Sequence, residues 1–372
     1  MALMYLIILF FFVLNHQSQG TQFSDLQKLE LERQYNLLKK PSVKTIKTKH
    51  GDIYDCVDFY KQPAFDHPLL KTHMFHPEMR PSYISNRNKS AKTSSEEDKI
   101  LLNSIKLNDG GCPTGTVPIR RYSKDDYIKI MQFTKEYASK AKPNANQQVC
   151  FDSNKSKSRN KGGRLSVCNL RVEPDQFTSG EFILQNGDDR LQVGYTVNPK
   201  LNKDNKTRMF QYIHAGQSHC FNVLCPGFIS VRSDIPIDAV IEPVSRAGRE
   251  IFRRFFFIYQ VGWYEKDATI IGFWPRRMFT GMAKSASYVA IGGETYSPPR
   301  KPLPLMGSGY KPGGNYDTSW FARCVSTFVV GENYDQTPPQ DTEKYTTNKA
   351  YVVADKRKVG KSGRVLYYGG PF

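Results

Sequence analysis

From Val149 to its end, the chain consists of short runs of aromatic and β-branched residues separated by turn residues. Such runs are typical of β-strands, because branched and aromatic side chains fit a pleated surface. Clusters of Gly, Pro and Asn mark the turns between them. Many short strands at close spacing predict an all-β domain, either an antiparallel sandwich or a barrel. Examples are RLQVGYTVNP, RMFQYIHAG, GFISVRS and GRVLYYGG.

The front of the chain has another pattern and predicts a small α+β domain. Residues 21–49 have apolar positions at helical spacing. Residues 51–71 begin like a strand and continue through prolines, and the polar residues 72–105 are typical of a linker. An extended segment at 112–123, the basic helix KDDYIKIMQFTKEYASKAK and a boundary at 143–148 complete the expected order. The expected domains are 1–20, 21–142 and 143–372.

The first twenty residues, MALMYLIILFFFVLNHQSQG, form an apolar run that ends in small and polar residues. This pattern predicts a secretory signal peptide, and an uncleaved anchor is the alternative. We therefore expect secretion to the extracellular space (apoplast) or the vacuole, and no membrane attachment once the signal is removed. Secretion makes disulfides and N-glycosylation available. The acceptor sequons are at Asn88, Asn154 and Asn205.

The chain carries a net charge of +18. Its basic residues are scattered and no zinc-finger spacing occurs, so we expect no nucleic-acid partner. Solvated loops are one explanation of the charge, and binding to an acidic wall polymer is the other. With no C-x-x-C pair and no zincin-type histidine pair, no metal or other cofactor is expected. His214 and His219 are expected to be structural rather than ligands.

The segment SYVAIGGETYS, from Ser287 to Ser297, predicts a strand with an unusual face. Alternate residues of a strand point to opposite faces, so Gly292, Glu294 and Tyr296 share one. Glycine and glutamate are both depleted in strands. A strand that carries two glycines and then a carboxylate is therefore a candidate for a functional site.

A second candidate is the hairpin GEFILQNGDDRLQVGYTVNP, in which Asn186-Gly187 predicts a tight turn. If these two residues form the loop, Glu181 lies directly opposite Gln192, and Gly194 follows on the same face. Two interpretations stay open: surface polar residues of an edge hairpin, or a cleft on the face of a sheet. The residues predicted to point into a core are Leu191, Val193, Tyr195 and Val197.

Several longer segments are specific enough to indicate a family. In the front half they are DCVDFYKQPAFDHPLLK and CPTGTVPIRR, and in the back half VEPDQF, VGYTVNP, CFNVLCPGFI, EPVS, IIGFWP, IGGETY, MGSGY and YYGGP. On these segments, their order and their spacing, the chain resembles the plant neprosin family of glutamic peptidases after its signal. The front segments resemble the activation-peptide domain of that family.

The resemblance implies a β-sandwich of two antiparallel sheets, synthesised with its own inhibitory pro-domain. It implies an acid-acting endopeptidase that needs no cofactor and cuts proline-containing peptides or proteins beside proline. Glu294 matches the second catalytic glutamate of the family and would handle the attacking water. Glycines beside it would let the substrate backbone approach the sheet. The expected lining of the substrate cleft is Gly194, Tyr195, Gly292 and Tyr296.

The first catalytic glutamate is where the chain departs from the family pattern I-E-A-G-W. The corresponding segment is LQVGY, with Gln192 at the glutamate position and Tyr195 in place of Trp. Glu181 stands on the preceding strand, where the family tends to carry Gln. Three outcomes stay open: a Gln192/Glu294 dyad with the amide as oxyanion donor, Glu181 as a replacement carboxylate, or an inactive protein that binds a peptide, a protein or a wall polymer.

The chain has seven cysteines, so at least one is not paired within the molecule. The resemblance implies a Cys220–Cys225 disulfide, and Cys56 with Cys112 would staple the pro-domain. Cys150 and Cys168 lie in successive strand-like segments and are predicted to pair across them. Cys324 is then left over.

Overall fold

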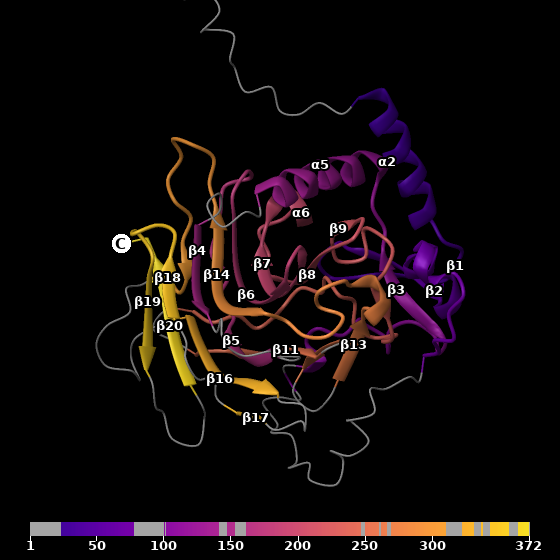
Figure 1. Ribbon diagram of the computed structural model, residues 1–372. Helices are drawn as coiled ribbons and strands as arrows, with labels where there is room; N and C mark the ends of the chain where they lie inside the picture. The colour runs from indigo at the N-terminus through magenta and orange to yellow at the C-terminus, as the bar shows by residue number, and fades with distance from the viewer. Residues whose placement is uncertain are drawn as a thin grey trace, which may run out of the picture.

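Most of the molecule is antiparallel β-structure (Figure 1). The computed structural model describes residues 24–77, 100, 102–140, 147–152, 161–246, 250–259, 262–265, 269–309, 322–330, 336–337, 343–356 and 364–371. The predicted signal peptide and most of the predicted linker lie outside these residues. Within them, none of the helices combines the length and the apolar composition that a bilayer crossing needs.

Two large antiparallel sheets make up the back of the chain, as the strand pattern predicted. One has the order β18 (Glu343–Thr346), β4 (Gln147–Asp152), β14 (Tyr288–Tyr296), β6 (Phe177–Asn186), β7 (Asp189–Val197), β8 (Arg208–Ala215) and β9 (Ser218–Phe221). The other has the order β10 (Ile229–Ser230), β13 (Thr269–Phe273), β12 (Gly262–Glu265), β11 (Arg253–Tyr259), β5 (Lys161–Ser166), β16 (Ala322–Val330), β20 (Arg364–Gly370) and β15 (Met306–Gly307). To this second sheet β17 (Gln336–Thr337) and β19 (Val352–Lys356) are added at β16 and β20.

One face of the seven-stranded sheet packs toward the other sheet, with contacts from β6 to β5 and from β7 to β11. Its side chains are apolar and buried, because every second residue of each strand points to this side. The all-β prediction is therefore confirmed, with a core between two sheets. Core residues on this face include Phe182, Leu184, Leu191, Val193, Tyr195, Val289 and Ile291.

The front of the chain forms helix α2 (Asp25–Leu38) and a small sheet of β1 (Ser42–Lys47), β2 (Ile53–Asp58) and β3 (Thr116–Arg120). The predicted helix over 21–49 is wrong beyond Leu38. Pro41 cannot continue a helix, and the following SVKTIK is rich in β-branched residues that favour a strand. Three single 3-10 turns occupy the proline-rich segment, over Phe59–Lys61, Pro63–Asp66 and Pro68–Leu70.

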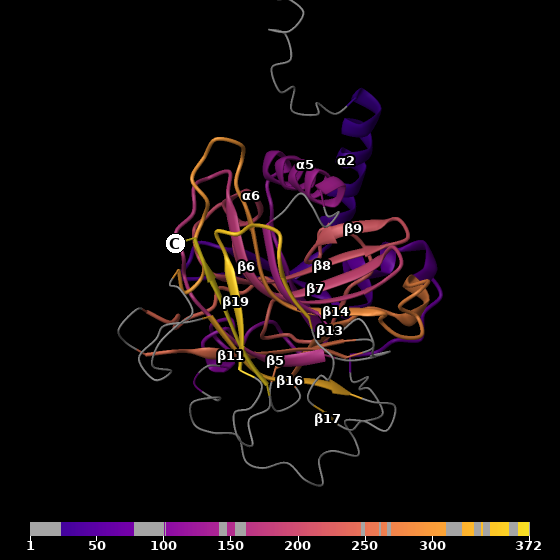
Figure 2. The ribbon, with the colours of Figure 1, turned by 60° about the vertical axis from the view of Figure 1, so that its left-hand side comes forward.

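Helix α5 (Lys124–Lys140) was predicted from sequence and lies beside β7, β8 and β9 in both views (Figures 1 and 2). It contacts β9, the short helix α6 (Pro199–Asn202) and α2. The aromatic rings of Phe133 and Phe221 stack there, with centroids 5.7 Å apart. The front domain therefore covers the second face of the seven-stranded sheet.

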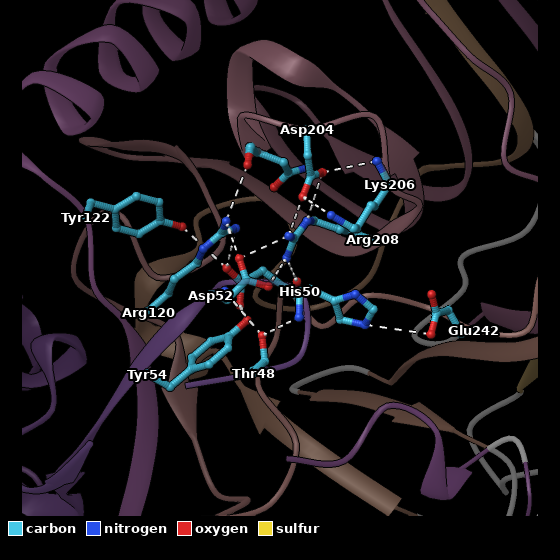
Figure 3. A network of polar contacts seen from close by, with 12 residues as sticks. Thr48, His50, Asp52, Tyr54, Arg120, Tyr122, Asp204, Lys206, Arg208 and Glu242 are labelled. Carbon is cyan, nitrogen blue, oxygen red and sulfur yellow. Dashed lines mark hydrogen bonds and ion pairs between the residues drawn. The ribbon is translucent and has the colours of Figure 1, made fainter. Parts of the chain in front are cut away.

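A buried ionic network also joins the two parts of the chain (Figure 3). The two carboxylate oxygens of Asp52 accept hydrogen bonds from Nη1 and Nη2 of Arg208, at 2.9 and 3.0 Å. Asp52 Oδ1 also lies 2.6 Å from Nη2 of Arg120. Arg208 forms a second ion pair with Asp204, at 2.6 Å. Asp238 accepts a 3.0 Å hydrogen bond from the Tyr54 hydroxyl. The Arg208 side chain is fully buried, so its charge depends on these carboxylates.

Two of the predicted disulfides form, Cys56–Cys112 and Cys220–Cys225. The predicted Cys150–Cys168 disulfide is wrong, because Cys168 is a free and buried thiol. Cys168 follows β5 and bridges to Ser245, whereas β4 pairs with β14 and β18. The two segments are successive in sequence but belong to different sheets, so they are not paired strands. Burial raises the pKa of Cys168 to about 12, as for an inert structural thiol.

Candidate active site

The β6–β7 hairpin turns at Gly187 and Asp188, so Asn186 pairs with Asp189. The sequence had placed the loop one residue earlier, and the resulting register is shifted by two residues. Glu181 consequently lies opposite Gly194, and Gln192 lies opposite Ile183. A shift of two keeps every side chain on its predicted face. Glu181 and Gln192 are therefore diagonal neighbours rather than direct partners.

Strand β14 completes the site on the other side of β6. Gly292 pairs with Glu181, and Glu294 pairs with Ser179. Glu181 thus has a glycine on each flank, Gly194 on β7 and Gly292 on β14. Because neither neighbour has a side chain, the longer side chains of Gln192 and Glu294 can lean toward Glu181 from opposite sides.

These three side chains form one buried polar cluster. Glu181 is 2%, Gln192 0% and Glu294 1% exposed. The Gln192 Nε2 donates to Glu181 Oε1 at 2.9 Å and lies 3.3 Å from Glu294 Oε2. Ser179 Oγ donates to the second oxygen of Glu181 at 3.1 Å. The sequence offered Gln192 and Glu294 as a dyad and Glu181 as an alternative carboxylate, and the fold places all three in one hydrogen-bonded cluster.

The electrostatics of the cluster favour one protonated carboxyl. Burial and, after it, the adjacent charge of Glu294 raise the pKa of Glu181 to about 8, whereas Arg190 opposes the shift. Two carboxyl groups this close do not both ionise readily. Glu181 is therefore mainly protonated at neutral pH and can donate a hydrogen bond.

The fourth member is Tyr137 of α5, which the sequence analysis did not identify. Its hydroxyl lies 2.7 Å from Glu294 Oε2 and accepts a 2.9 Å hydrogen bond from Gln192 Nε2. Its ring packs edge-on against Tyr212 at 4.8 Å. Burial raises the Tyr137 pKa well above its ordinary value, so the hydroxyl stays protonated as a donor. No local sequence signal marks this tyrosine, because its partners are 55 and 157 residues away.

The predicted cleft lining is only partly at this site. Gly194 and Gly292 flank Glu181, and Tyr296 lies on the Glu294 face, where it stacks on Phe177 at 6.0 Å. Tyr195 does not line the site. It follows Gly194 and so points into the core, where it is 3% exposed.

Position 194 requires glycine, because β6 and β7 approach each other too closely there for a side chain. A Cβ at this position would lie 2.0 Å from the Gly180 carbonyl oxygen.

Of the predicted glycosylation sites, Asn205 is exposed before β8, and Asn88 and Asn154 lie outside the described residues.

The fold and the site define the class of this protein. It is a β-sandwich with a buried pair of carboxyl groups on one sheet, and a helix of an N-terminal domain covers that pair. Residues 174–371, more than half of the chain, match the family model for neprosin, and residues 45–162 match the neprosin activation peptide. The chain therefore belongs to the neprosin family and carries its activation-peptide domain. Tyr137 lies within the activation-peptide match.

Among solved structures, the chain is similar to the crystal structure of Scytalido-glutamic peptidase with a peptide-based transition state analog. The sequences are 8% identical, and the likeness covers 60% of this chain and 97% of the other, with a TM-score of 0.35. At this distance the likeness supports no statement about activity.

We expect Tyr137→Phe to weaken the binding of α5 to the site. The ring still packs, but Glu294 loses its 2.7 Å donor and Gln192 loses an acceptor. A hydrogen bond to a charged group contributes about 1.5–3 kcal/mol, so release of the activation peptide should rise about tenfold or more. Limited proteolysis of α5 at neutral pH measures this, with Tyr60→Phe, an exposed tyrosine, as control. Equal cleavage rates in both variants would contradict the prediction.

The raised pKa of Glu181 also predicts a pH dependence of stability. Neutral Glu181 contributes stability that is fully present below its unfolded pKa and is lost as pH rises through about 8. We expect Glu181→Gln to flatten the decline in the free energy of unfolding between about pH 5 and 8. Denaturant titrations at both pH values test this, with the exposed Glu173→Gln as control. A decline as steep as in the parent chain would be evidence against it.

Proposed function

We propose that the protein is a secreted glutamic endopeptidase zymogen that cleaves near proline at acid pH. Residues 1–20 would be the signal peptide, 21–142 the activation peptide and 143–372 the catalytic-type domain. The observation that carries the proposal is the buried cluster of Glu181, Gln192 and Glu294 with Tyr137 of the activation peptide seated on it.

Each member of the cluster suits one step of peptide hydrolysis. Glu294 would be the general base that takes a proton from water as the water oxygen attacks the carbonyl carbon. The Gln192 amide would donate to the developing oxyanion. Glu181, already protonated, would give its proton to the leaving amine as the C–N bond breaks, and the Glu294 proton would restore it.

The raised pKa of Glu181 supports this division of roles. A pair of carboxyl groups whose environments separate their pKa values provides an acid and a base in one site. Gln192 cannot release a proton to the amine, so a Gln192/Glu294 dyad alone would need Glu294 to act twice. With Glu181 as the acid, the exchange of Gln and Glu across the hairpin preserves both functions.

The activation peptide would inhibit by occupying the site. Tyr137 uses the hydrogen-bonding groups of Glu294 and Gln192 that a substrate and its water would need. Its ring is surrounded by Phe177, Tyr212 and Phe221. Activity would therefore require removal or displacement of α5.

The second candidate is a catalytically inactive neprosin-fold protein that binds a peptide, another protein or an acidic wall polymer. The observation that favours it is Gln192 at the position of a family catalytic glutamate. Such a protein would keep its ligand when Glu294 becomes Gln, whereas a peptidase would lose its activity.

The deciding experiment incubates the purified secreted protein with proline-rich peptides at about pH 3–6, the range in which carboxyl groups titrate. Products are identified by mass, beside the Glu294→Gln variant as control. We expect cleavage next to proline that the variant lacks. Absence of cleavage by folded protein whose α5 segment has been removed would reject the peptidase and favour the binding protein.

A test of the proposed roles is the double exchange Gln192→Glu with Glu181→Gln. It returns the carboxylate to β7 and the amide to β6 and preserves the charge of the site. We expect activity within about tenfold of the parent, whereas Glu181→Gln alone should lose roughly 10²–10⁴-fold, the contribution of a general acid. Steady-state kcat/KM at pH 5 measures both. Full activity of the single variant would show that Glu181 is not the acid.

A further inference from the structure

Three basic side chains lie next to one another on the face of the sheet that carries the carboxyl pair. Arg190 on β7 pairs with His214 on β8, and His214 pairs with His219 on β9. Arg190 shares its face with Gln192, because the two residues are two positions apart. The basic row therefore runs parallel to the row of Gln192, Tyr212 and Phe221, about 7 Å along the strands.

The two histidine rings of this row pack against each other, and the charge of Arg190 acts on the carboxyl cluster. The rings of His214 and His219 meet edge-on with centroids 3.9 Å apart, and both residues are half-buried. Arg190 is 8% exposed. Its charge influences the pKa of Glu181 and that of Tyr137, so its guanidinium lies within electrostatic reach of the carboxyl cluster.

The two acids that precede Arg190 in the chain, Asp188 and Asp189, lie outside this row. Asp189 points to the opposite face, where its Oδ2 accepts from the backbone N–H of Thr280 at 2.7 Å and of Met282 at 3.0 Å. Asp188 lies in the hairpin turn. The sheet face itself thus presents three groups that can carry positive charge beside a site that binds, on the proposed function, a peptide.

We propose that Arg190, His214 and His219 form a subsite for the carboxylate side chain of a glutamate or aspartate close to the scissile bond. A guanidinium matches a carboxylate with two parallel hydrogen bonds. Adjacent cations repel one another, and a bound anion relieves that repulsion. The proposal rests on the proposed function in taking this face as the peptide-binding face.

The histidines restrict the subsite to acid conditions. Burial lowers the pKa of both, and for His214 the charges of His219 and Arg190 lower it further, whereas Asp188 and Asp189 raise it. Both rings are therefore mainly neutral at pH 7. They gain protons as the pH falls into the acid range, where a substrate carboxylate is still ionised down to about pH 4, so the preference for acidic residues should increase on acidification.

The first test compares proline-containing peptides that differ only by Glu or Gln, placed in turn at each position around the proline. At pH 5 we expect kcat/KM for the best Glu peptide to exceed that of its Gln partner about tenfold, as one charged hydrogen bond provides. Arg190→Met should bring this ratio near one, and the exposed Arg171→Met should leave it unchanged. A wild-type ratio near one at every position, or an unaltered ratio in Arg190→Met, would overturn the proposal.

A second measurement does not need catalysis. The half-buried histidines of the full chain are followed by NMR with N-acetylglutamate or N-acetylglutamine as the probe, and are assigned with His214→Gln and His219→Gln. We expect only N-acetylglutamate to raise the histidine pKa values, and not in Arg190→Met. If no peptide is cleaved but this shift occurs, the proposed function fails and the carboxylate site stands. If peptides are cleaved and neither probe shifts the histidines, the subsite is rejected.

Discussion

Replacement of Glu294 by Gln is expected to lower kcat/KM for proline-containing peptides by roughly 10²–10⁴-fold, the usual contribution of a general base. The substitution is almost isosteric and removes the carboxylate that would take a proton from water. The side chain is 1% exposed and lies between Tyr137 and Gln192. The amide should keep the packing of the site, so the variant should remain folded.

The measurement is steady-state cleavage at pH 5 by protein freed of α5, with circular dichroism as the check on folding. Glu173→Gln, at an exposed position just before β6, is the matched control and should retain parent activity. Loss of activity in both variants would indicate a general charge effect. Retained activity in Glu294→Gln would remove Glu294 from the mechanism.

Replacement of Asp52 by Ala is expected to destabilise the full chain by about 3–5 kcal/mol, the loss that follows removal of one partner from a buried ion pair. Asp52 binds Arg208 through both oxygens and also contacts Arg120 at 2.6 Å. Without it, Asp204 still pairs with Arg208 and Asp238 with Arg120, but each buried guanidinium group has lost a carboxylate partner. The network joins the activation peptide to the large domain, so α5 should also become easier to release.

The free energy of unfolding at pH 7, from denaturant titration, measures the first effect, and proteolysis of α5 measures the second. Asp25→Ala is the control, because its ion pair with Lys28 is fully exposed on the aspartate side and such pairs contribute about 0–1 kcal/mol. Equal stability of the two variants would show that the network is not a stabilising contact.

The sequence alone determined the fold class and the face on which the site lies. Alternation along the two strands of the hairpin put Glu181 and Gln192 on one side, because side-chain direction is a local property with a period of two. The family resemblance implied that Glu294 joins them on that face. The prediction survived an error in the turn, since moving the loop from Asn186-Gly187 to Gly187-Asp188 shifts the register by two and changes no face. Family segments were likewise readable, because they are contiguous.

Tertiary structure alone decided how these residues meet and what covers them. The diagonal placement of Glu181 depends on its glycine neighbours on two other strands, and its raised pKa depends on its burial and on the nearby Glu294. Tyr137 reaches partners far away in sequence. The free thiol of Cys168 follows from the assignment of successive segments to different sheets. Each of these is a long-range packing result, for which local patterns contain no signal.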